Sequence, residues 1–360
     1  MNSLTDKLWR TGSNWIGSLP NPFRPEKIHI ITDGHDWVIT QVAKSLAQSL
    51  TNKNVAQVHV SPFFHFFSGK VIHFNSVPVP KKFPRNKVIH TWYHVNQDDP
   101  RLKELGRVAS RIDLLHTTAQ TTKAILMQQG FPEEKIRVIP MGINLGMFTS
   151  SPASERKHIR TELRIPEKAF VIGSFQKDGD GWGAGMNPKW IKGPDVFCDV
   201  VERVAKELPV HVLLSGPSRG YVKDRLTRAN IPFTHQFVSA YADVNTLYQA
   251  LDVYLISSRT EGVPMALLEA WATGTPLVST RVGMVMDVAV DGQNALLADI
   301  EDRDKLTTHL LRLQSDSALR TRLTSEGIQQ AQCHRWEILS NRYWEELYKP
   351  LLRNSEFVKL

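Results

Sequence analysis

The sequence contains little cysteine and no long hydrophobic run. Among its 360 residues, Cys198 and Cys333 are the only cysteines, and neither lies in a Cys-x-x-Cys motif. This usage argues against a disulfide framework or a structural zinc site and favours a reducing compartment. No stretch approaches the roughly 18 consecutive apolar residues of a membrane-spanning helix, and the polar N-terminus lacks the apolar core of a secretory signal. We therefore expect a cytoplasmic protein.

Negative charge is scarce in the first part of the chain. Residues 1–150 contain 18 Lys and Arg against 10 Asp and Glu, whereas residues 151–360 contain 26 of each. A basic surface attracts an acidic partner such as an anionic membrane, a phosphorylated acceptor or nucleic acid. Ordinary solubility explains the same excess, and both interpretations stay open.

Two segments of this basic part have an unusual composition. Residues 61–70, SPFFHFFSGK, are strongly aromatic, and residues 81–87, KKFPRNK, are strongly basic. Together they suit peripheral docking on the inner face of an anionic membrane, with rings in the interface and lysines at the phosphates. Alternatively, the phenylalanines fill the core and the lysines belong to a solvated loop.

Short β-branched runs alternate with helical patterns along most of the chain. Strands joined by crossover helices predict a parallel sheet covered on both faces. Residues 140–158 interrupt the alternation with Gly, Pro and Ser, which is typical of a linker between domains. The expected strands are 27–32, 55–60, 70–74, 87–91, 112–117 and 136–140, then 169–175, 210–216, 233–238, 252–257 and 276–280; the expected helices are 36–50, 118–130, 194–208, 241–252 and 264–274.

We therefore predict an α/β protein with two doubly wound, Rossmann-like domains, each built on a parallel sheet. The expected parts are an extension at 1–26, a first domain at 27–148, a second domain at 149–333 and a terminal segment at 334–360. The helix expected at 335–352 is rich in Trp and Tyr, which predicts that it packs back on the first domain.

The segment 257–280, SSRTEGVPMALLEAWATGTPLVST, carries the most chemical information. Gly262 frees the backbone at a turn, and Pro264 suits the first turn of a helix whose free N–H groups can bind a phosphate. Glu269 lies in an otherwise apolar helix, where a carboxylate is costly unless a partner such as a sugar hydroxyl binds it. The structural alternative is that Glu269 pairs with a nearby Arg and that Glu261 caps the helix.

The two glutamates belong to a longer pattern. Seven residues separate Glu261 from Glu269, with Gly-x-Pro after the first and Glu-Ala-x-Ala-x-Gly-x-Pro from the second. This pattern resembles the retaining glycosyltransferases of family four. Residues 130–148 and 279–306 resemble the corresponding segments of that family, and the similarity extends over about residues 27–350.

The resemblance implies a GT-B fold and the transfer of a sugar, with retention of anomeric configuration, from a nucleotide-sugar donor to a polysaccharide, glycolipid or other hydroxyl acceptor. It implies neither a metal ion nor another cofactor. Glu261 would face the donor sugar, Glu269 would bind the ribose hydroxyls, and Lys192 would stabilise the departing diphosphate. The backbone along the sugar and diphosphate would be that of Gly262, Val263, Pro264 and Met265.

The sequence departs from the family pattern after the first strand of the second domain. Where the family has Gly-Arg, this chain has Gly173 and Ser174. The second cation at the phosphate is therefore missing, and Lys177 or Arg259 is a candidate replacement.

A Gly-rich insertion, residues 176–190, follows this position. It is either a lid over the cleft or a surface loop. Within it, Asp178 and Asp180 have the Asp-x-Asp form of a metal site in another class of glycosyltransferase. We attribute this form to chance and expect no metal site.

Two weaker matches occur in the first domain. Gly34 follows the first expected strand, where the family's glycine loop approaches the diphosphate. His94 follows a later strand, where the family has a histidine near the reacting sugar, and His90 is the second choice. A lone histidine in such a position is also commonly structural.

Other functions stay open. A nucleotide-sugar hydrolase or epimerase on the same scaffold needs no acceptor. A catalytically silent subunit would bind a sugar nucleotide or a polysaccharide without turnover, and the presence of Glu261, Glu269 and Lys192 argues against it. Nucleic-acid binding explains the charge but not the motif, so the expected partners are a nucleotide sugar and an acceptor, not a nucleic acid.

Overall fold

The structure is a computed structural model that describes residues 28–35, 37–62, 71–80, 86–95 and 99–353. The chain divides into two compact units, the first formed by residues 1–142 with 336–360 and the second by residues 143–335. The expected extension at 1–26 and most of the aromatic and basic segments, 61–70 and 81–87, lie outside the described residues.

The boundary between the units follows Gly142, earlier than the expected 148. The backbone N–H of Ile143 donates a hydrogen bond to the carbonyl of His334 (2.9 Å). The ring of Phe148 contacts those of Tyr241 and Tyr248 at centroid distances of 5.2 and 6.4 Å. Because these partners all lie within residues 143–335, the expected linker belongs to the second unit from Ile143 onward, and only residues 140–142 belong to the first.

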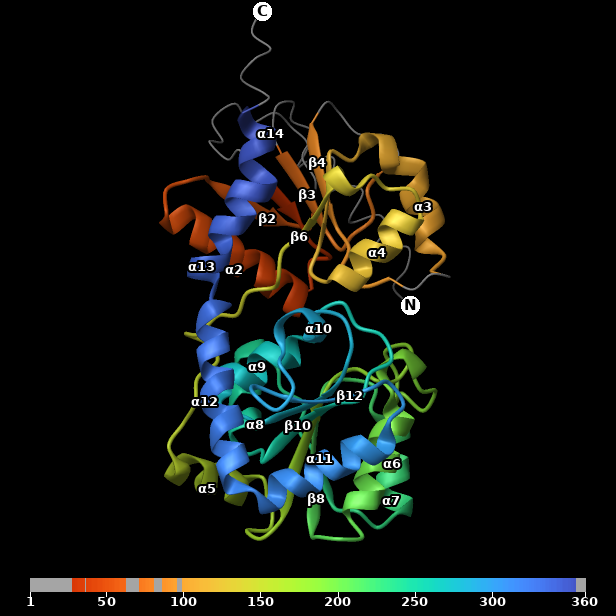
Figure 1. Cartoon of the computed structure of the whole chain (residues 1–360), viewed down its shortest axis with the longest axis vertical. Coiled ribbons are helices and arrows are strands. Elements are labelled where there is room, and N and C mark those ends of the chain that lie inside the picture. Colours follow the sequence, from red (N-terminus) through yellow and green to blue (C-terminus); the bar gives the residue numbers. More distant parts are fainter. Residues whose placement is uncertain (1–27, 36, 63–70, 81–85, 96–98, 354–360) are drawn as a thin grey trace, which may run out of the picture. The chain divides into compact units, whose positions relative to one another are not determined.

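The first unit is built on a six-stranded parallel sheet with the order β2–β1–β3–β4–β5–β6 (Figure 1). All residues of the first and third strands are buried, as expected for strands covered on both faces. The strands are β1 (Ile28–Ile31), β2 (Val58–Ser61), β3 (Val71–Asn75), β4 (Lys87–Thr91), β5 (Leu114–Thr117) and β6 (Ile136–Val138).

Helices cover both faces of this sheet (Figure 1). One face carries α2 (Val38–Asn52) and the terminal elements α13 (Trp336–Arg342), η5 (Tyr343–Tyr348) and α14 (Lys349–Arg353); the other carries α3 (Arg101–Val108) and α4 (Gln120–Gln128). Short 3-10 turns are η1 (Ala109–Arg111) and η2 (Glu133–Lys135).

The C-terminal segment packs on the first unit, which confirms the prediction. The Ser49 hydroxyl of α2 is hydrogen-bonded to that of Ser340 in α13 (2.8 Å). Farther along, the Tyr348 hydroxyl is hydrogen-bonded to His73 of β3 (2.7 Å). The segment differs from the single helix expected, because a π-helical stretch, η5, separates its two α-helical parts.

The second unit is built on a six-stranded parallel sheet with the order β12–β11–β10–β7–β8–β9. The strand order reverses between β7 and β10, which pair directly, and such a switch point is where parallel sheets bind ligands. The last strand was not expected, since its three residues are too few to show a pattern. The strands are β7 (Phe170–Phe175), β8 (Val210–Ser215), β9 (Phe233–His235), β10 (Val253–Ile256), β11 (Leu277–Thr280) and β12 (Leu296–Ala298).

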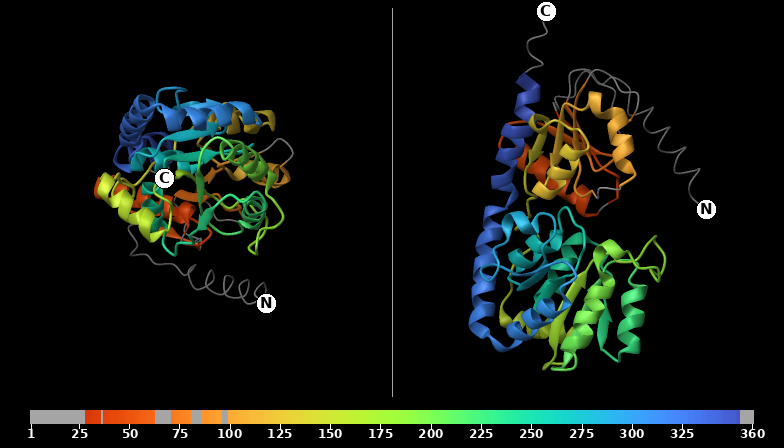
Figure 2. Two further views of the ribbon diagram at one scale, coloured as in Figure 1. Left: turned by 90° about the horizontal axis from the view of Figure 1, so that it is seen from below. Right: turned by 45° about the vertical axis from the view of Figure 1, so that its right-hand side comes forward.

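Helices again form two layers, which Figure 2 shows from two further directions. One layer contains α6 (Pro194–Val204), α7 (Gly220–Arg228) and α11 (Arg303–Ser315); the other contains α5 (Ala153–Glu162), α8 (Val244–Gln249), α9 (Met265–Thr273) and α12 (Ser317–Cys333). The shorter elements are η3 (Trp190–Lys192), η4 (Tyr241–Asp243) and α10 (Val285–Val288).

Two helices near the motif differ from expectation. The helix expected at 241–252 is divided into the 3-10 turn η4 and the short α8. The helix expected at 264–274 begins at Met265, so Pro264 is its N-cap residue and not part of its first turn. Throughout the described part of the chain, no helix combines the length and apolar character needed to cross a membrane.

Candidate functional site

Lys192 and Glu261 form an ion pair in the second unit. Lys192 ends η3, and Glu261 lies in the loop between β10 and α9, beside the switch point. The Lys192 Nζ is 2.5 Å from the Glu261 Oε1, and the Ser258 hydroxyl donates to the same oxygen (2.9 Å). The Glu261 side chain is only 7% exposed. The sequence predicted both charged residues but neither their pairing nor the role of Ser258.

Backbone packing brings the two loops together. Gly193 has a φ of +60°, and a Cβ at this position would lie 2.0 Å from the carbonyl oxygen of Ser257. The Ser257 hydroxyl donates to the Gly193 carbonyl (2.9 Å). The N–H groups of Arg259 and Thr260 both donate to the carbonyl of Ile191 (2.9 and 3.1 Å). The glycine is therefore required for the close approach that places Lys192 at Glu261.

The Arg259 guanidinium is already engaged by protein groups. It binds both carboxylate oxygens of Asp195 (2.8 and 2.6 Å) and also contacts Glu301. A further hydrogen bond joins it to the carbonyl of Trp190 (2.8 Å). The hydrogen bonds that Arg259 donates to the carboxylates of Asp195 and Glu301 raise the pKa of Arg259, against the effect of burial. Through these contacts Arg259 holds several loops together. Its contact with a phosphate stays a prediction.

Glu269 is buried in α9, and two tyrosines bind its carboxylate. The Tyr241 hydroxyl donates to Oε1, and the Tyr248 hydroxyl donates to Oε2 (2.7 Å). Burial raises the pKa of Glu269, and the two hydrogen bonds oppose that rise. The structural alternative foresaw an Arg partner, whereas the partners are tyrosines. No local motif marks either tyrosine in the sequence.

Gly173 and Ser174 lie near the end of β7, and a buried arginine binds Ser174. Arg219 donates to the carbonyl (2.5 Å) and the hydroxyl (3.0 Å) of Ser174, and its guanidinium is 2.9 Å from Asp178. A Cβ on Gly173 would lie 2.3 Å from Leu251, so the strand needs a glycine there. Sequence reasoning missed Arg219, because it lies far along the chain from Ser174.

Asp178 is therefore part of a buried ion pair. Its side chain is 1% exposed and that of Arg219 is fully buried. Burial raises the pKa of Asp178, and the Arg219 charge opposes the rise. Asp180 instead accepts a hydrogen bond from the Asn187 amide (3.0 Å). Among the described residues, no three or more His, Cys, Asp or Glu side chains are grouped so as to hold a metal ion.

The insertion 176–190 is attached to the start of α7. The N–H of Gly220 donates to the carbonyl of Ala184 (2.7 Å), and the Ser218 hydroxyl donates to that of Gly183 (3.0 Å). Lys177 lies over the ring of Trp182, 3.9 Å from its centroid, and Trp182 is 72% exposed. These contacts fit a packed surface loop with an exposed tip.

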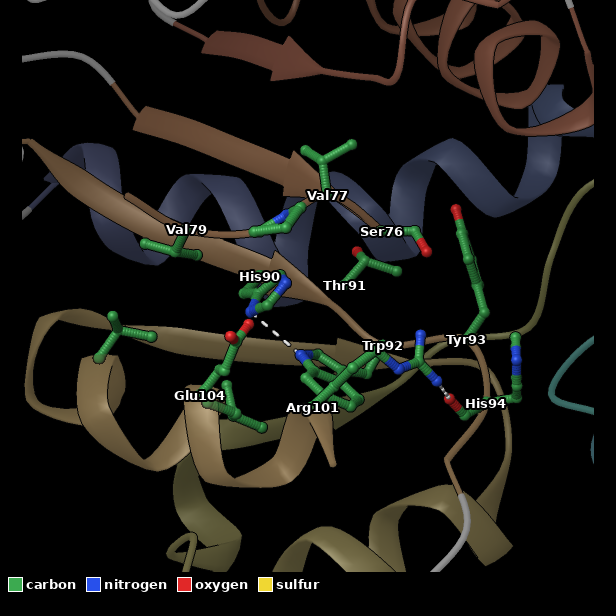
Figure 3. A pocket seen from close by; sticks show the side chains of 13 residues that line it. Ser76, Val77, Val79, His90, Thr91, Trp92, Tyr93, His94, Arg101 and Glu104 are labelled. Carbon is green, nitrogen blue, oxygen red and sulfur yellow. Dashed lines mark hydrogen bonds between the residues drawn. The ribbon is translucent and has the colours of Figure 1, made fainter. Parts of the chain in front are cut away.

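His90 and His94 line a pocket of the first unit, together with Trp92 and Arg101 (Figure 3). The His90 Nδ1 accepts a hydrogen bond from the Trp92 indole (3.0 Å), and burial lowers the pKa of His90 to about 3. His90 is therefore neutral at neutral pH. Arg101 donates to the backbone carbonyl of His94 (3.3 Å). The role of His94 at a reacting sugar stays a prediction.

Gly34 occupies the turn after β1. Its φ is +79°, and a Cβ there would lie 2.8 Å from the Cβ of Pro62. The backbone conformation and the close contact are sufficient reasons for a glycine at this position. The contact of Gly34 with a diphosphate stays a prediction.

Part of the chain matches a known family. Residues 182–316 match the family model described as Glycosyl transferases group 1. The D-inositol 3-phosphate glycosyltransferase of Corynebacterium urealyticum is 28% identical over 280 residues, which cover 72% of this chain and 62% of that protein. The lipopolysaccharide core biosynthesis glycosyltransferase LpsE of Rhizobium meliloti is 32% identical over 133 residues, 36% of this chain and 39% of that protein. The chain thus spans less than two thirds of the length of these relatives.

Solved structures share the architecture. Anabaena HepE in complex with UDP and glucose has a TM-score of 0.71 at 18% identity, covering 89% of this chain and 99% of its own. The sucrose-phosphate synthase of Thermosynechococcus elongatus has a TM-score of 0.70 at 17% identity, covering 91% of this chain and 100% of its own. The chain has the GT-B fold, and its second unit contains the segment that matches Glycosyl transferases group 1.

Proposed function

We propose that this protein is a retaining glycosyltransferase that needs no metal ion and transfers a sugar from a nucleotide-sugar donor to a hydroxyl acceptor. The observation that carries the proposal is the ion pair of Lys192 with the buried Glu261 at the switch point of the second sheet. The segment that surrounds it, residues 182–316, matches a glycosyltransferase model.

The chemistry of the site fits departure of a nucleoside diphosphate. When the sugar–phosphate bond breaks, negative charge develops on the leaving diphosphate. A fixed ammonium at Lys192 and the free N–H groups at the start of α9 would stabilise that charge. Glu261 would accept hydrogen bonds from the sugar hydroxyls, and Glu269 those from the ribose. His94 would stand near the reacting sugar, and Lys177 near the phosphates.

The similar proteins suggest which compounds to test first. HepE was solved with UDP and with UDP-glucose, so uridine sugars are the first donors for this chain. The names of the two relatives suggest an inositol phosphate and a lipopolysaccharide core saccharide as first acceptors.

The test is a panel of UDP-, GDP- and ADP-sugars, whose binding is measured by thermal shift and calorimetry in the presence of EDTA. We expect selective stabilisation by one base and its loss in Glu269→Gln, which keeps the shape of the side chain. Two further results would support transfer with retention. Nucleoside diphosphate is released only when an acceptor is present, and NMR shows that the product keeps the anomeric configuration of the donor. No binding of any nucleotide sugar contradicts it.

The same experiment separates the alternatives. Free sugar or an isomer formed without an acceptor identifies a hydrolase or an epimerase. Binding of the donor without turnover, over a broad panel of acceptors, identifies a silent binding subunit.

Peripheral contact of a cytoplasmic enzyme with an anionic membrane is the second part of the proposal. Its support is the excess of Lys and Arg in residues 1–150. Sedimentation with vesicles of phosphatidylglycerol and phosphatidylcholine, against phosphatidylcholine alone, tests it. We expect binding to the anionic vesicles at low ionic strength and its loss at high salt. Equal behaviour toward both vesicles excludes this contact.

A further inference from the structure

Both oxygens of the Glu269 carboxylate already have a hydrogen-bond donor within the protein. Its residue is 5% exposed, and each oxygen accepts a hydrogen bond from a tyrosine hydroxyl. A buried carboxylate without such bonds would be strongly destabilising. The carboxylate could accept further hydrogen bonds, but at 5% exposure it is covered by protein groups. A ligand hydroxyl therefore reaches it only where one of the covering groups moves away.

The two tyrosines are held very differently. Tyr248 lies in α8, has no exposed surface, and packs against the rings of Phe175 and Tyr254 (centroid distances of 4.9 and 5.3 Å). Tyr241 begins the single 3-10 turn η4 and is partly exposed. The same stretch, between β9 and α8, contains the 54% exposed Phe237. Tyr248 is thus fully enclosed in the core, whereas Tyr241 is partly exposed on a short turn, where its ring contacts that of Phe148 (5.2 Å).

We propose that Tyr241 is a replaceable cap on Glu269, whose hydroxyl occupies the place of a ribose hydroxyl and leaves when a ribonucleotide binds. The inference rests on the proposed function, because it assumes that Glu269 receives the ribose. The exchange conserves hydrogen bonds at the carboxylate: one O–H donor replaces another, and the tyrosine hydroxyl turns to water. Tyr241 thereby lowers the affinity for a ribonucleotide and reduces the discrimination against a nucleotide that lacks the ribose hydroxyls.

The cap also explains how a carboxylate is kept ionisable in an apolar helix before the donor arrives. Around Glu269, the helix α9 is made of Leu267, Leu268, Ala270 and Trp271, all buried. The Tyr241 hydroxyl satisfies the carboxylate before the nucleotide binds, and under the proposal a ribose hydroxyl can take its place. A fixed arginine in the same place would hold it too strongly to be replaced by neutral hydroxyls.

Calorimetry of Tyr241→Phe with UDP, GDP and ADP and with their 2′,3′-dideoxy forms tests the proposal. The variant lacks the competing hydroxyl, so we expect it to bind the preferred ribonucleotide about fivefold to tenfold more tightly than the wild type. The dideoxy form, which has no ribose hydroxyl to offer, should bind equally to both proteins. Without ligand, the variant should melt at a lower temperature, because Oε1 has lost its donor.

Tyr248→Phe is the matched control, since it removes the same group from the other oxygen of the same carboxylate. We expect a lower melting temperature and no gain in affinity, because the fixed ring opens no room for the ligand. Three outcomes would overturn the cap. Tyr241→Phe changes the affinity for the ribo and dideoxy forms equally, or it binds the ribonucleotide more weakly than the wild type. In the third outcome, Tyr248→Phe gains as much affinity as Tyr241→Phe.

A measurement on the otherwise unchanged chain covers the case in which a variant does not fold. With 3-fluorotyrosine at position 241, the ¹⁹F signal should shift on addition of the ribonucleotide and not of its dideoxy form. With the label at position 248, it should stay. An unshifted label at 241 in a protein that binds the nucleotide contradicts the cap and leaves the proposed function intact. A wild type that binds no nucleotide contradicts both.

Discussion

Lys192 is the residue whose charge the proposed reaction uses most directly. Its ammonium is 2.5 Å from a carboxylate oxygen and 22% exposed, so a ligand can still reach it. Lys192→Met removes the charge and keeps much of the side-chain volume. We expect kcat to fall by about 10²–10³, the loss typical of removing one group that stabilises a developing anion.

The control is Lys206→Met, the same substitution at an exposed lysine of the second unit. It should leave kcat and KM unchanged in a steady-state assay of nucleoside diphosphate release. Equal losses of kcat in both variants would mean that the net charge of the protein matters and not the position of Lys192 in the site.

Besides the pair of Lys192 and Glu261, single substitutions can test the buried ion pair of Arg219 and Asp178. Both side chains are buried, and neither Asp178 oxygen has a well-aligned hydrogen bond besides this ion pair. Arg219→Met leaves the carboxylate buried without a counter-charge, and we expect a loss of about 3–5 kcal/mol in the free energy of unfolding. The double variant Asp178→Leu, Arg219→Met should recover part of this loss. Urea denaturation measures both, and an equally unstable double variant contradicts the pairing.

At the scale of elements, one glycine joins two loops. Gly193 combines a φ of +60° with the contact to Ser257 described above. Gly193→Ala should lower stability by about 1–3 kcal/mol and also reduce kcat, because the backbone must move and carry Lys192 away from Glu261.

Gly181→Ala separates the two causes. Its φ is +66°, but nothing lies within 4 Å of the added Cβ. It should therefore show the strain of a left-handed residue without loss of kcat. A similar loss of activity in both variants, at similar stability, would mean that the approach of the two loops is unimportant.

The contact of the C-terminal segment with the first sheet runs through a chain of hydrogen bonds. The carbonyl of Ile139 can only accept, so the His116 Nε2 donates to it (3.1 Å) and the His116 Nδ1 accepts from Thr91 (2.9 Å). Thr91 then accepts from His73 (2.5 Å), and His73 accepts from Tyr348 (2.7 Å). With both histidines neutral, as their lowered pKa values indicate, the direction of every bond follows from the terminal carbonyl.

This chain predicts that the first unit loses stability in acid. Burial lowers the pKa of His73 well below its ordinary value and that of His116 from 6.5 to about 4. Below pH 6.5 the unfolded chain binds protons that the folded unit does not. Stability should therefore fall as the pH drops from about 6.5 to 4, by about 3 kcal/mol for His116 alone.

Hydrogen exchange of the strands of the first unit, measured from pH 7 to 4, follows this loss. His116→Gln should reduce the pH dependence, and His158→Gln, at an exposed histidine of the second unit, should not. An unchanged slope in His116→Gln contradicts the assignment of neutral histidines.

For the whole molecule, the important feature is that the two units have separate hydrophobic cores. One core is formed within residues 31–136 and the other within residues 170–323. A nucleoside diphosphate without sugar should therefore protect mainly the second unit from hydrogen exchange, most strongly at 190–193, 241–249 and 257–273. Exchange mass spectrometry with and without the nucleotide measures this. Protection concentrated in residues 28–142 would contradict the donor site.

Much of the fold could be predicted from the sequence because it depends on local patterns. The six residues of β8, VHVLLS, are all buried and form an evident strand. The strand β12 and the helices α3, α5, α7, α11 and α12 were not among the expected elements. These helices are mostly polar and each buries few side chains, so their apolar pattern is weak. The first compact unit ends at Gly142 and not at 148, and Phe148 is buried against the ring of Tyr241, a contact between residues far apart in the chain that a local pattern does not show.

Residues close together in the chain were enough to predict both parallel sheets, most of their strands and the motif around Glu261 and Glu269, because each of these depends on a local pattern. The folded chain was needed to show that Lys192 pairs with Glu261, that Arg219 lies against Ser174 and that tyrosines bind Glu269. These partners come from different strands and loops. They meet only when the sheet has formed, and a charged or polar side chain has many possible partners until then.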